Sequence, residues 1–168
     1  MFAFKKKYFL IIESIKDLEL KNIKKNKKLV IIYRRNNKKI ENLVELKKFR
    51  KNCYIKDFKF FVANNTQLTV LLKADGLYIS SYNKSFKCLF LKNLNYTIIG
   101  SAHNPREIQF KVKQGCKYIL LSRLFKVDYD NNNNFLGIIK FNNFLNIPCC
   151  SSASFNPVTD SINLVLPG

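Results

Sequence analysis

Short apolar segments rich in β-branched and aromatic residues alternate with helix-compatible segments along the chain, and this alternation constrains the fold more than any other feature. Strands are expected at residues 7–14, 28–35, 58–65, 76–81, 97–103, 117–125 and 147–153. Helical patterns occupy residues 39–49, 66–73, 85–93, 105–114 and 136–146. Because the strands are continuously apolar and are joined by helices, we expect an α/β fold with a parallel sheet buried on both faces.

The first helical pattern predicts one apolar face made of Ile40, Leu43, Val44 and Leu46. No internal repeat and no glycine-rich phosphate-binding fingerprint is present in the sequence.

The sharpest boundary lies between the strand at 97–103 and the helix at 105–114. Asn104 is placed to cap this helix, with Pro105 at its first position, Glu107 at its third and Gly115 just past its end. The only histidine, His103, therefore lies where a strand meets a helix. In parallel α/β folds this carboxyl edge of the sheet is where ligands bind.

The net charge is +19 over 168 residues, a length that fits one domain. Lys, Asn, Ile, Phe and Tyr are abundant together, as an AT-rich coding sequence would impose, so we interpret much of the charge as solvated surface lysine. The chain carries no recognisable nucleic-acid-binding motif, and we expect no specific nucleic-acid partner.

Five cysteines are present, an odd number without C-x-x-C or Cys/His metal spacing, which predicts a reduced, cytoplasmic protein. The apolar run at residues 8–12 is too short for a signal peptide or a membrane span, and we expect no membrane association. Cys149 and Cys150 are interpreted most simply as small buried residues.

Three motifs occur in order between residues 74 and 125. Residues 74–83, ADGLYISSYN, resemble the pattern A-D-G-V-H-L-G-Q-x-D, and residues 99–103, IGSAH, are similar to I-G-x-S-x-H, one residue shorter. Residues 115–125, GCKYILLSRLF, resemble G-A-D-Y-I-x-x-G-P-V-F. Together they resemble the thiamine phosphate synthase and thiazole tautomerase (TenI) family, which implies a (β/α)8 TIM-barrel-like fold over about residues 7–148.

The synthase branch of this family joins a pyrimidine diphosphate to a thiazole phosphate with help from Mg²⁺, so the resemblance implies small phosphorylated substrates. The two metal-binding aspartates of the family pattern are replaced here by Asn65 and Asn83. An amide oxygen brings no charge, so any Mg²⁺ site is expected to be weakened, and no metal ligand is assigned. The resemblance suggests a diphosphate clamp at Arg34 or Arg35, with compensating charge from Arg123 or Lys126.

The tautomerase branch needs no metal and moves a proton with a histidine, whose position is similar to that of His103. An imidazole can donate and accept a proton near neutral pH, which suits this reaction. Ser101, Asn64 and the helix amides near Arg106 are candidates for binding the substrate phosphate. The alternative for His103 is a loop histidine satisfied by water or backbone; for the other residues it is capping, turn formation or solvated charge.

The sequence changes character after Pro148, because residues 149–168 contain no lysine. We expect a barrel domain at 1–148 and an atypical tail at 149–168, the tail being either an ordinary extension or the product of a changed coding frame. Residues 162–168 are a candidate eighth strand, but about a dozen residues are too few for a standard connection. An incomplete barrel of about seven strands would expose strand edges, which favours a homo-oligomer.

Two functions remain open from the sequence. The first is an enzyme of thiamine biosynthesis, either a synthase-like transferase or a tautomerase-like isomerase. The second is a catalytically inactive remnant or phosphate-binding module of the same fold.

Overall fold

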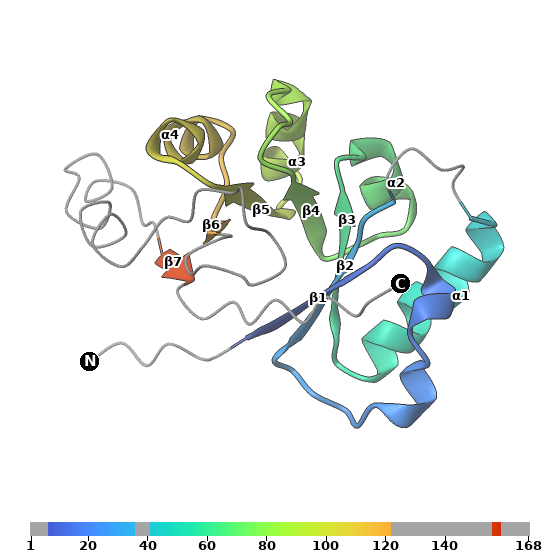
Figure 1. Cartoon of the computed structure of the whole chain (residues 1–168). Coiled ribbons are helices and arrows are strands. Elements are labelled where there is room, and N and C mark those ends of the chain that lie inside the picture. Colours follow the sequence, from blue (N-terminus) through green and yellow to red (C-terminus); the bar gives the residue numbers. More distant parts are fainter. Residues whose placement is uncertain (1–6, 36–40, 122–155, 159–168) are drawn as a thin grey trace.

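The structure, a computed structural model, describes residues 7–35, 41–121 and 156–158, and these form one curled parallel sheet with helices along its outer side (Figure 1). The strands are β1 (Tyr8–Ile12), β2 (Leu29–Tyr33), β3 (Lys59–Ala63), β4 (Gly76–Ile79), β5 (Thr97–Ala102), β6 (Tyr118–Leu121) and β7 (Asn156–Val158). The α-helices are α1 (Leu43–Ile55), α2 (Thr66–Leu71), α3 (Leu89–Asn93) and α4 (Pro105–Lys113). Short 3-10 helices are η1 (Ile15–Asp17), η2 (Leu20–Asn22) and η3 (Phe86–Cys88).

The strand order in the sheet equals the order along the chain, and every neighbouring pair is parallel. Each of the connections from β2 to β6 contains a helix, which is the βαβ arrangement that parallel pairing requires. Among the described residues β1 and β7 form the two edges and do not pair with each other. The described strands are therefore an open part of a (β/α) barrel, as the sequence predicts.

Six of the seven predicted strands are confirmed within their expected ranges, as β1 to β6. The predicted helix at 136–146, the predicted strand at 147–153 and the candidate strand at 162–168 lie outside the described residues. The strand β7, which pairs with β6, comes from a stretch that the sequence pattern did not predict as a strand.

The apolar face expected for the first helix is confirmed in part, because Leu46 is buried and the partly buried Leu43 packs against the same cluster, while Ile40 lies outside the described residues and Val44 is exposed. Asn42 caps α1 by accepting a hydrogen bond from the Val44 amide at 2.9 Å, and this start places the Val44 side chain in solvent, 73% exposed. The buried residues are Leu46, Phe49 and Cys53, so the stripe continues from the predicted Leu46 toward the end of the helix. The helix begins later than expected because its cap, and not the apolar pattern alone, sets its phase.

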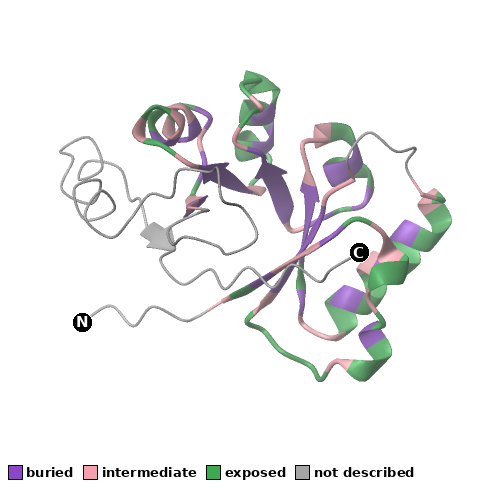
Figure 2. Cartoon of the chain, in the orientation of Figure 1, coloured by how far each residue is buried: buried purple, intermediate pink, exposed green. Residues whose placement is uncertain are grey.

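Both faces of the sheet are buried (Figure 2). Because side chains alternate along each strand, one set points toward the helices and the other toward the inner side of the curled sheet. The outer set packs with α1 to α4 in two apolar clusters. The inner set forms a cluster of its own, whose buried members are Phe9, Val30, Ile32, Phe61, Tyr78, Ile99 and Leu120.

None of the helices in the described ranges is both long and apolar enough to cross a membrane.

Gly76 is required at the start of β4, since a Cβ atom there would lie 1.9 Å from the backbone oxygen of Thr97 on β5. We expect Gly76→Ala to lower the free energy of unfolding by about 3 kcal/mol or more, because a backbone atom cannot move aside without breaking the strand pairing. Urea denaturation followed by circular dichroism measures this change.

The control is Gly115→Ala, where a Cβ atom meets nothing closer than 3.6 Å but the φ of +75° disfavours alanine. That variant should lose about 1–2 kcal/mol. An equal or smaller loss for Gly76→Ala would contradict the tight contact between β4 and β5.

Candidate functional site

Polar side chains continue the inward-facing positions of three strands at their carboxyl ends. Arg34 follows Val30 and Ile32 in the alternation of β2, and its amide donates to the Ile12 carbonyl oxygen at 2.8 Å, which keeps the segment parallel to β1. Ser101 follows Ile99 on the inner side of β5. Sequence position therefore brings these two predicted residues to one edge of the sheet.

Tyr78 on β4 connects Ser101 and Arg34. It is 4% exposed, and its hydroxyl lies close enough to the Ser101 side chain and to the Arg34 guanidinium for both to act on its pKa. Burial raises the pKa of Tyr78 by disfavouring the phenolate, while Ser101 and Arg34 oppose that rise. Tyr78 is therefore a neutral hydroxyl donor beside a cation, an arrangement suited to binding an anion.

Arg35 is separated from this cluster. Its guanidinium Nη1 lies 3.2 Å from the Glu41 carboxylate, and its neighbour Tyr33 belongs to the helix-facing cluster. The sequence left Arg34 and Arg35 as alternatives, and the alternation of β2 places Arg34 alone on the inner side. Arg123 and Lys126 lie outside the described residues.

Asn64 lies at the same edge, directly after β3, with a φ of 57° that asparagine tolerates better than most residues. Its Nδ2 donates to Ser80 Oγ at 2.8 Å and to the Tyr82 hydroxyl at 3.1 Å. Its Oδ1 accepts from the Ser80 amide and from Asn83 Nδ2, both at 3.0 Å. Its hydrogen-bonding groups are thus occupied by the segment that follows β4, and Asn64 joins β3 to that segment.

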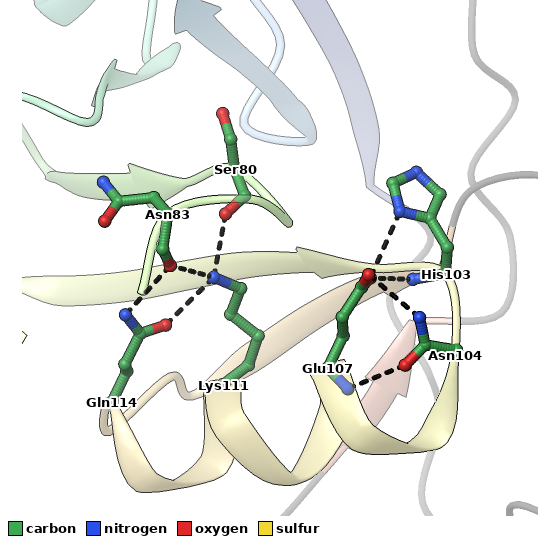
Figure 3. A network of polar contacts seen from close by, with 7 residues as sticks. All are labelled: Ser80, Asn83, His103, Asn104, Glu107, Lys111 and Gln114. Atoms are coloured by element: carbon green, nitrogen blue, oxygen red, sulfur yellow. Dashed lines mark hydrogen bonds and ion pairs between the residues drawn. The ribbon is translucent and has the colours of Figure 1, made fainter. Parts of the chain in front are cut away.

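His103 directly follows β5 and pairs with Glu107 in the first turn of α4 (Figure 3). Its Nδ1 lies 3.2 Å from Glu107 Oε2, and the same oxygen accepts the His103 backbone N–H at 2.7 Å. Because a carboxylate only accepts, this contact favours the tautomer with the proton on Nδ1 and leaves Nε2 as an acceptor. The His103 side chain is 37% exposed, so the ring is partly accessible to a small molecule.

The local sequence builds this pair through the predicted helix cap. Asn104 Oδ1 accepts from the Glu107 amide at 2.9 Å, Pro105 occupies the first turn, and Gly115 follows the helix with positive φ, so the predicted cap signals are confirmed. The Glu107 carboxylate also accepts from Asn104 Nδ2 at 2.9 Å. The sequence predicted Glu107 as a capping residue only. It did not predict the contact between Glu107 and the His103 ring.

The three cysteines in the described part of the chain, Cys53, Cys88 and Cys116, are all buried and unpaired. Burial raises the pKa of Cys53 and of Cys116 to about 12. These two thiols are protonated at neutral pH, which excludes them as nucleophiles there.

Known proteins of one class share this sequence pattern and fold. A thiamine-phosphate synthase of Prochlorococcus marinus subsp. pastoris is 30% identical over 125 residues, which cover 72% of this chain and 36% of that protein. A thiamine phosphate pyrophosphorylase from Pyrococcus furiosus superposes with a TM-score of 0.62 at 18% identity, covering 90% of this chain and 72% of that one. The chain belongs to the thiamine phosphate synthase-like family.

It is a divergent member of that family. The match spans little more than a third of the curated relative's length, and no protein-family model matches the chain. The likeness to the Pyrococcus furiosus protein concerns the (β/α) barrel fold.

Divergence from the thiamine phosphate synthase-like pattern is clear at positions 65 and 83, where that pattern has aspartates and this chain has asparagines. Asn65 caps α2, its Oδ1 accepting the Leu68 amide at 2.8 Å, and Asn83 Oδ1 accepts the Ser85 amide at 2.9 Å. Both amide oxygens are therefore engaged with backbone N–H groups, and neither brings a charge. The described residues contain no group of three or more His, Cys, Asp or Glu side chains able to hold a metal ion. This donor set does not fit Mg²⁺, which prefers carboxylates, and we assign no step to a metal.

Restoring the two carboxylates should restore a metal site. In the double variant Asn65→Asp/Asn83→Asp, the carboxylate introduced at position 65 can still cap α2, and the pair of carboxylates should bind Mg²⁺. We expect Mg²⁺ at about five times its Kd to stabilise this double variant by about 1 kcal/mol, and to leave the wild type unchanged.

Thermal unfolding in Mg²⁺, against NaCl of equal ionic strength, measures the difference. Equal stabilisation of both proteins by Mg²⁺ would show that the asparagine site binds the ion as it stands.

Proposed function

We propose that this protein binds a thiazole phosphate at the carboxyl edge of the sheet and acts in thiamine biosynthesis. The observation that carries the proposal is the convergence of Arg34, Tyr78 and Ser101 from three strands on the inner side of that edge. A guanidinium and two hydroxyls supply the charge and the hydrogen-bond donors that a phosphate requires. Membership of the thiamine phosphate synthase-like family supports the choice of a thiazole phosphate over other phosphorylated molecules.

The reaction that the described residues suit best is a proton transfer. Glu107 holds His103 by Nδ1 and by its backbone N–H, so the ring is oriented before a substrate arrives. The accessible Nε2 can take a proton from one atom of a bound thiazole and return it to another, with the Glu107 carboxylate stabilising the transient imidazolium. This isomerisation needs neither a departing diphosphate nor the carboxylates that Asn65 and Asn83 replace.

The second candidate is a phosphate-binding protein without turnover. The loss of charge at Asn65 and Asn83 favours it over a synthase, since a diphosphate leaving group would depart without a metal. The two candidates share the binding residues and differ only in whether His103 acts on the ligand.

Arg34→Gln tests the binding part of the proposal. Loss of a charged hydrogen bond worth about 1.5–3 kcal/mol should raise the Kd for thiazole phosphate at least tenfold. Isothermal titration calorimetry measures the Kd, and inorganic phosphate should compete.

The matched control is Arg35→Gln, the same change one residue further along, on a side chain that pairs with Glu41. Its Kd should stay within about twofold of wild type. Equal weakening in both variants would point to bulk charge and contradict a site on the inner side.

His103→Gln and Glu107→Gln test the proton transfer. We expect His103→Gln to abolish isomerisation of thiazole phosphate while the Kd changes little, because the ring acts on the ligand after binding. Glu107→Gln keeps an acceptor for the histidine but removes the charge, so turnover should fall roughly tenfold to a thousandfold.

Deuterium exchange at the thiazole followed by nuclear magnetic resonance measures proton transfer directly. Unchanged exchange in His103→Gln would remove the histidine from the mechanism. Absence of exchange in the wild type, with binding intact, would select the phosphate-binding protein.

A further inference from the structure

Lys111 is a buried cation in the last turn of α4 that the proposed reaction does not use (Figure 3). Its side chain is 1% exposed, and its ammonium donates to the carbonyl oxygens of Ser80 and Asn83, each at 2.8 Å, and to Gln114 Oε1 at 3.0 Å. All three ammonium donors are thereby satisfied, and each of these acceptors is neutral.

Gln114 completes the arrangement from the same helix. It is fully buried, and its Nε2 donates to the carbonyl oxygens of Asn83 at 3.1 Å and Ser85 at 2.8 Å. Three carbonyl groups of the segment 80–85 are therefore held from α4, and the Asn83 carbonyl is held twice. We call residues 80–85 the rim loop.

Burying an ammonium without a carboxylate partner costs desolvation free energy, which a neutral side chain at this position would not lose. Burial lowers the pKa of Lys111, while Cys116, Glu107 and Cys88 act in the opposite direction. The neighbouring strand is also shaped for this side chain. A Cβ atom at Gly100 would lie 2.9 Å from Lys111 Cδ and 2.9 Å from Cys116 Sγ, so glycine leaves the room that the lysine stem occupies.

The rim loop held by Lys111 lies directly after the strand that carries Tyr78. Its Ser80 amide and Asn83 side chain donate to Asn64, and Tyr82 accepts from Asn64. Asn83 is also the position at which the family pattern has a metal-binding aspartate. In this chain a lysine on α4 binds the backbone carbonyl of that residue, and its side chain donates to Asn64 Oδ1.

We propose that Lys111 is a positioning residue, whose ammonium serves as a fixed internal cation that shapes the rim loop for ligand binding without a divalent metal. The proposal rests on the proposed function for the identity of the ligand. The shape of the loop itself can be measured without any ligand.

The test compares Lys111→Met with Lys113→Met in the full chain. Both variants remove one lysine from α4, but Lys113 is exposed and Lys111 is not. Backbone hydrogen exchange is measured by mass spectrometry with and without thiazole phosphate, and the Kd is measured by calorimetry with and without millimolar Mg²⁺.

We expect exchange in the rim loop of Lys111→Met to rise about tenfold while β5 and α4 stay protected. The Kd should rise about tenfold, and saturating ligand should restore protection of the loop, which a purely structural role for Lys111 would not produce. Lys113→Met should match the wild type, and Mg²⁺ should change neither wild-type value.

If hydrogen exchange in the rim loop of Lys111→Met equals that of the wild type, Lys111 does not hold the loop. If the Kd for thiazole phosphate is unchanged in this variant, Lys111 has no role in ligand binding. If Lys111→Met does not fold, Gln114→Met, which removes two of the bonds to the loop, must show the same effects at smaller size or the proposal fails. If the wild type does not bind thiazole phosphate, the proposed function fails, while the exchange experiment still decides whether Lys111 shapes the loop.

Discussion

The parallel pairing of adjacent strands in fixed register is the constraint on which the rest of this structure depends. A parallel ladder needs a connection between each pair of strands, and the helices in those connections cover the outer face of the sheet. With both faces buried, a slip of one residue would exchange every inward side chain for an outward one. Because such a slip is costly, the register fixes Arg34 and Ser101 on the inner side and their neighbours Arg35 and Ala102 on the outer side. The position of each candidate site residue is therefore a consequence of packing along the whole strand.

Local signals in the sequence predicted much of this architecture, because apolar runs and helix caps act over a few residues. The strands β1 to β6 and the capped helix α4 follow from such signals. The face of α1 followed only in part, because Leu43 and Leu46 pack against the core while Val44, next to the first turn capped by Asn42, lies in solvent. Tyr78 was overlooked because its role depends on Ser101 and Arg34, which come from other strands. Its alternation with the inner apolar positions was the signal that could have identified it.

Three asparagines, Asn64, Asn65 and Asn83, lie at the rim, and two of them replace aspartates of the family pattern. Two aspartates placed close together repel each other unless a cation lies between them. Asparagine carries both donors and an acceptor, so Asn64 and Asn83 bind each other directly, and Asn65 caps α2 without an ion. A single aspartate at position 83 would place a carboxylate against Asn64 Oδ1, which now accepts from Asn83 Nδ2. Asn65 and Asn83, the two neutral replacements of the family pattern, are thus each satisfied by partners of their own.

Helix α4 contacts both His103, at its first turn, and the rim loop, at its last turn. His103, Glu107, Lys111 and Gln114 are separated by four, four and three residues, so they lie along one face of the helix and its entry. The same face carries Ile108 into the core, which means that a lysine at position 111 falls on a stripe where helical periodicity favours an apolar side chain. A buried lysine in such a stripe is informative because its position is costly unless its bonds are needed. One helix thus orients the histidine at its first turn and holds the rim loop at its last, so a shift of α4 would move both together.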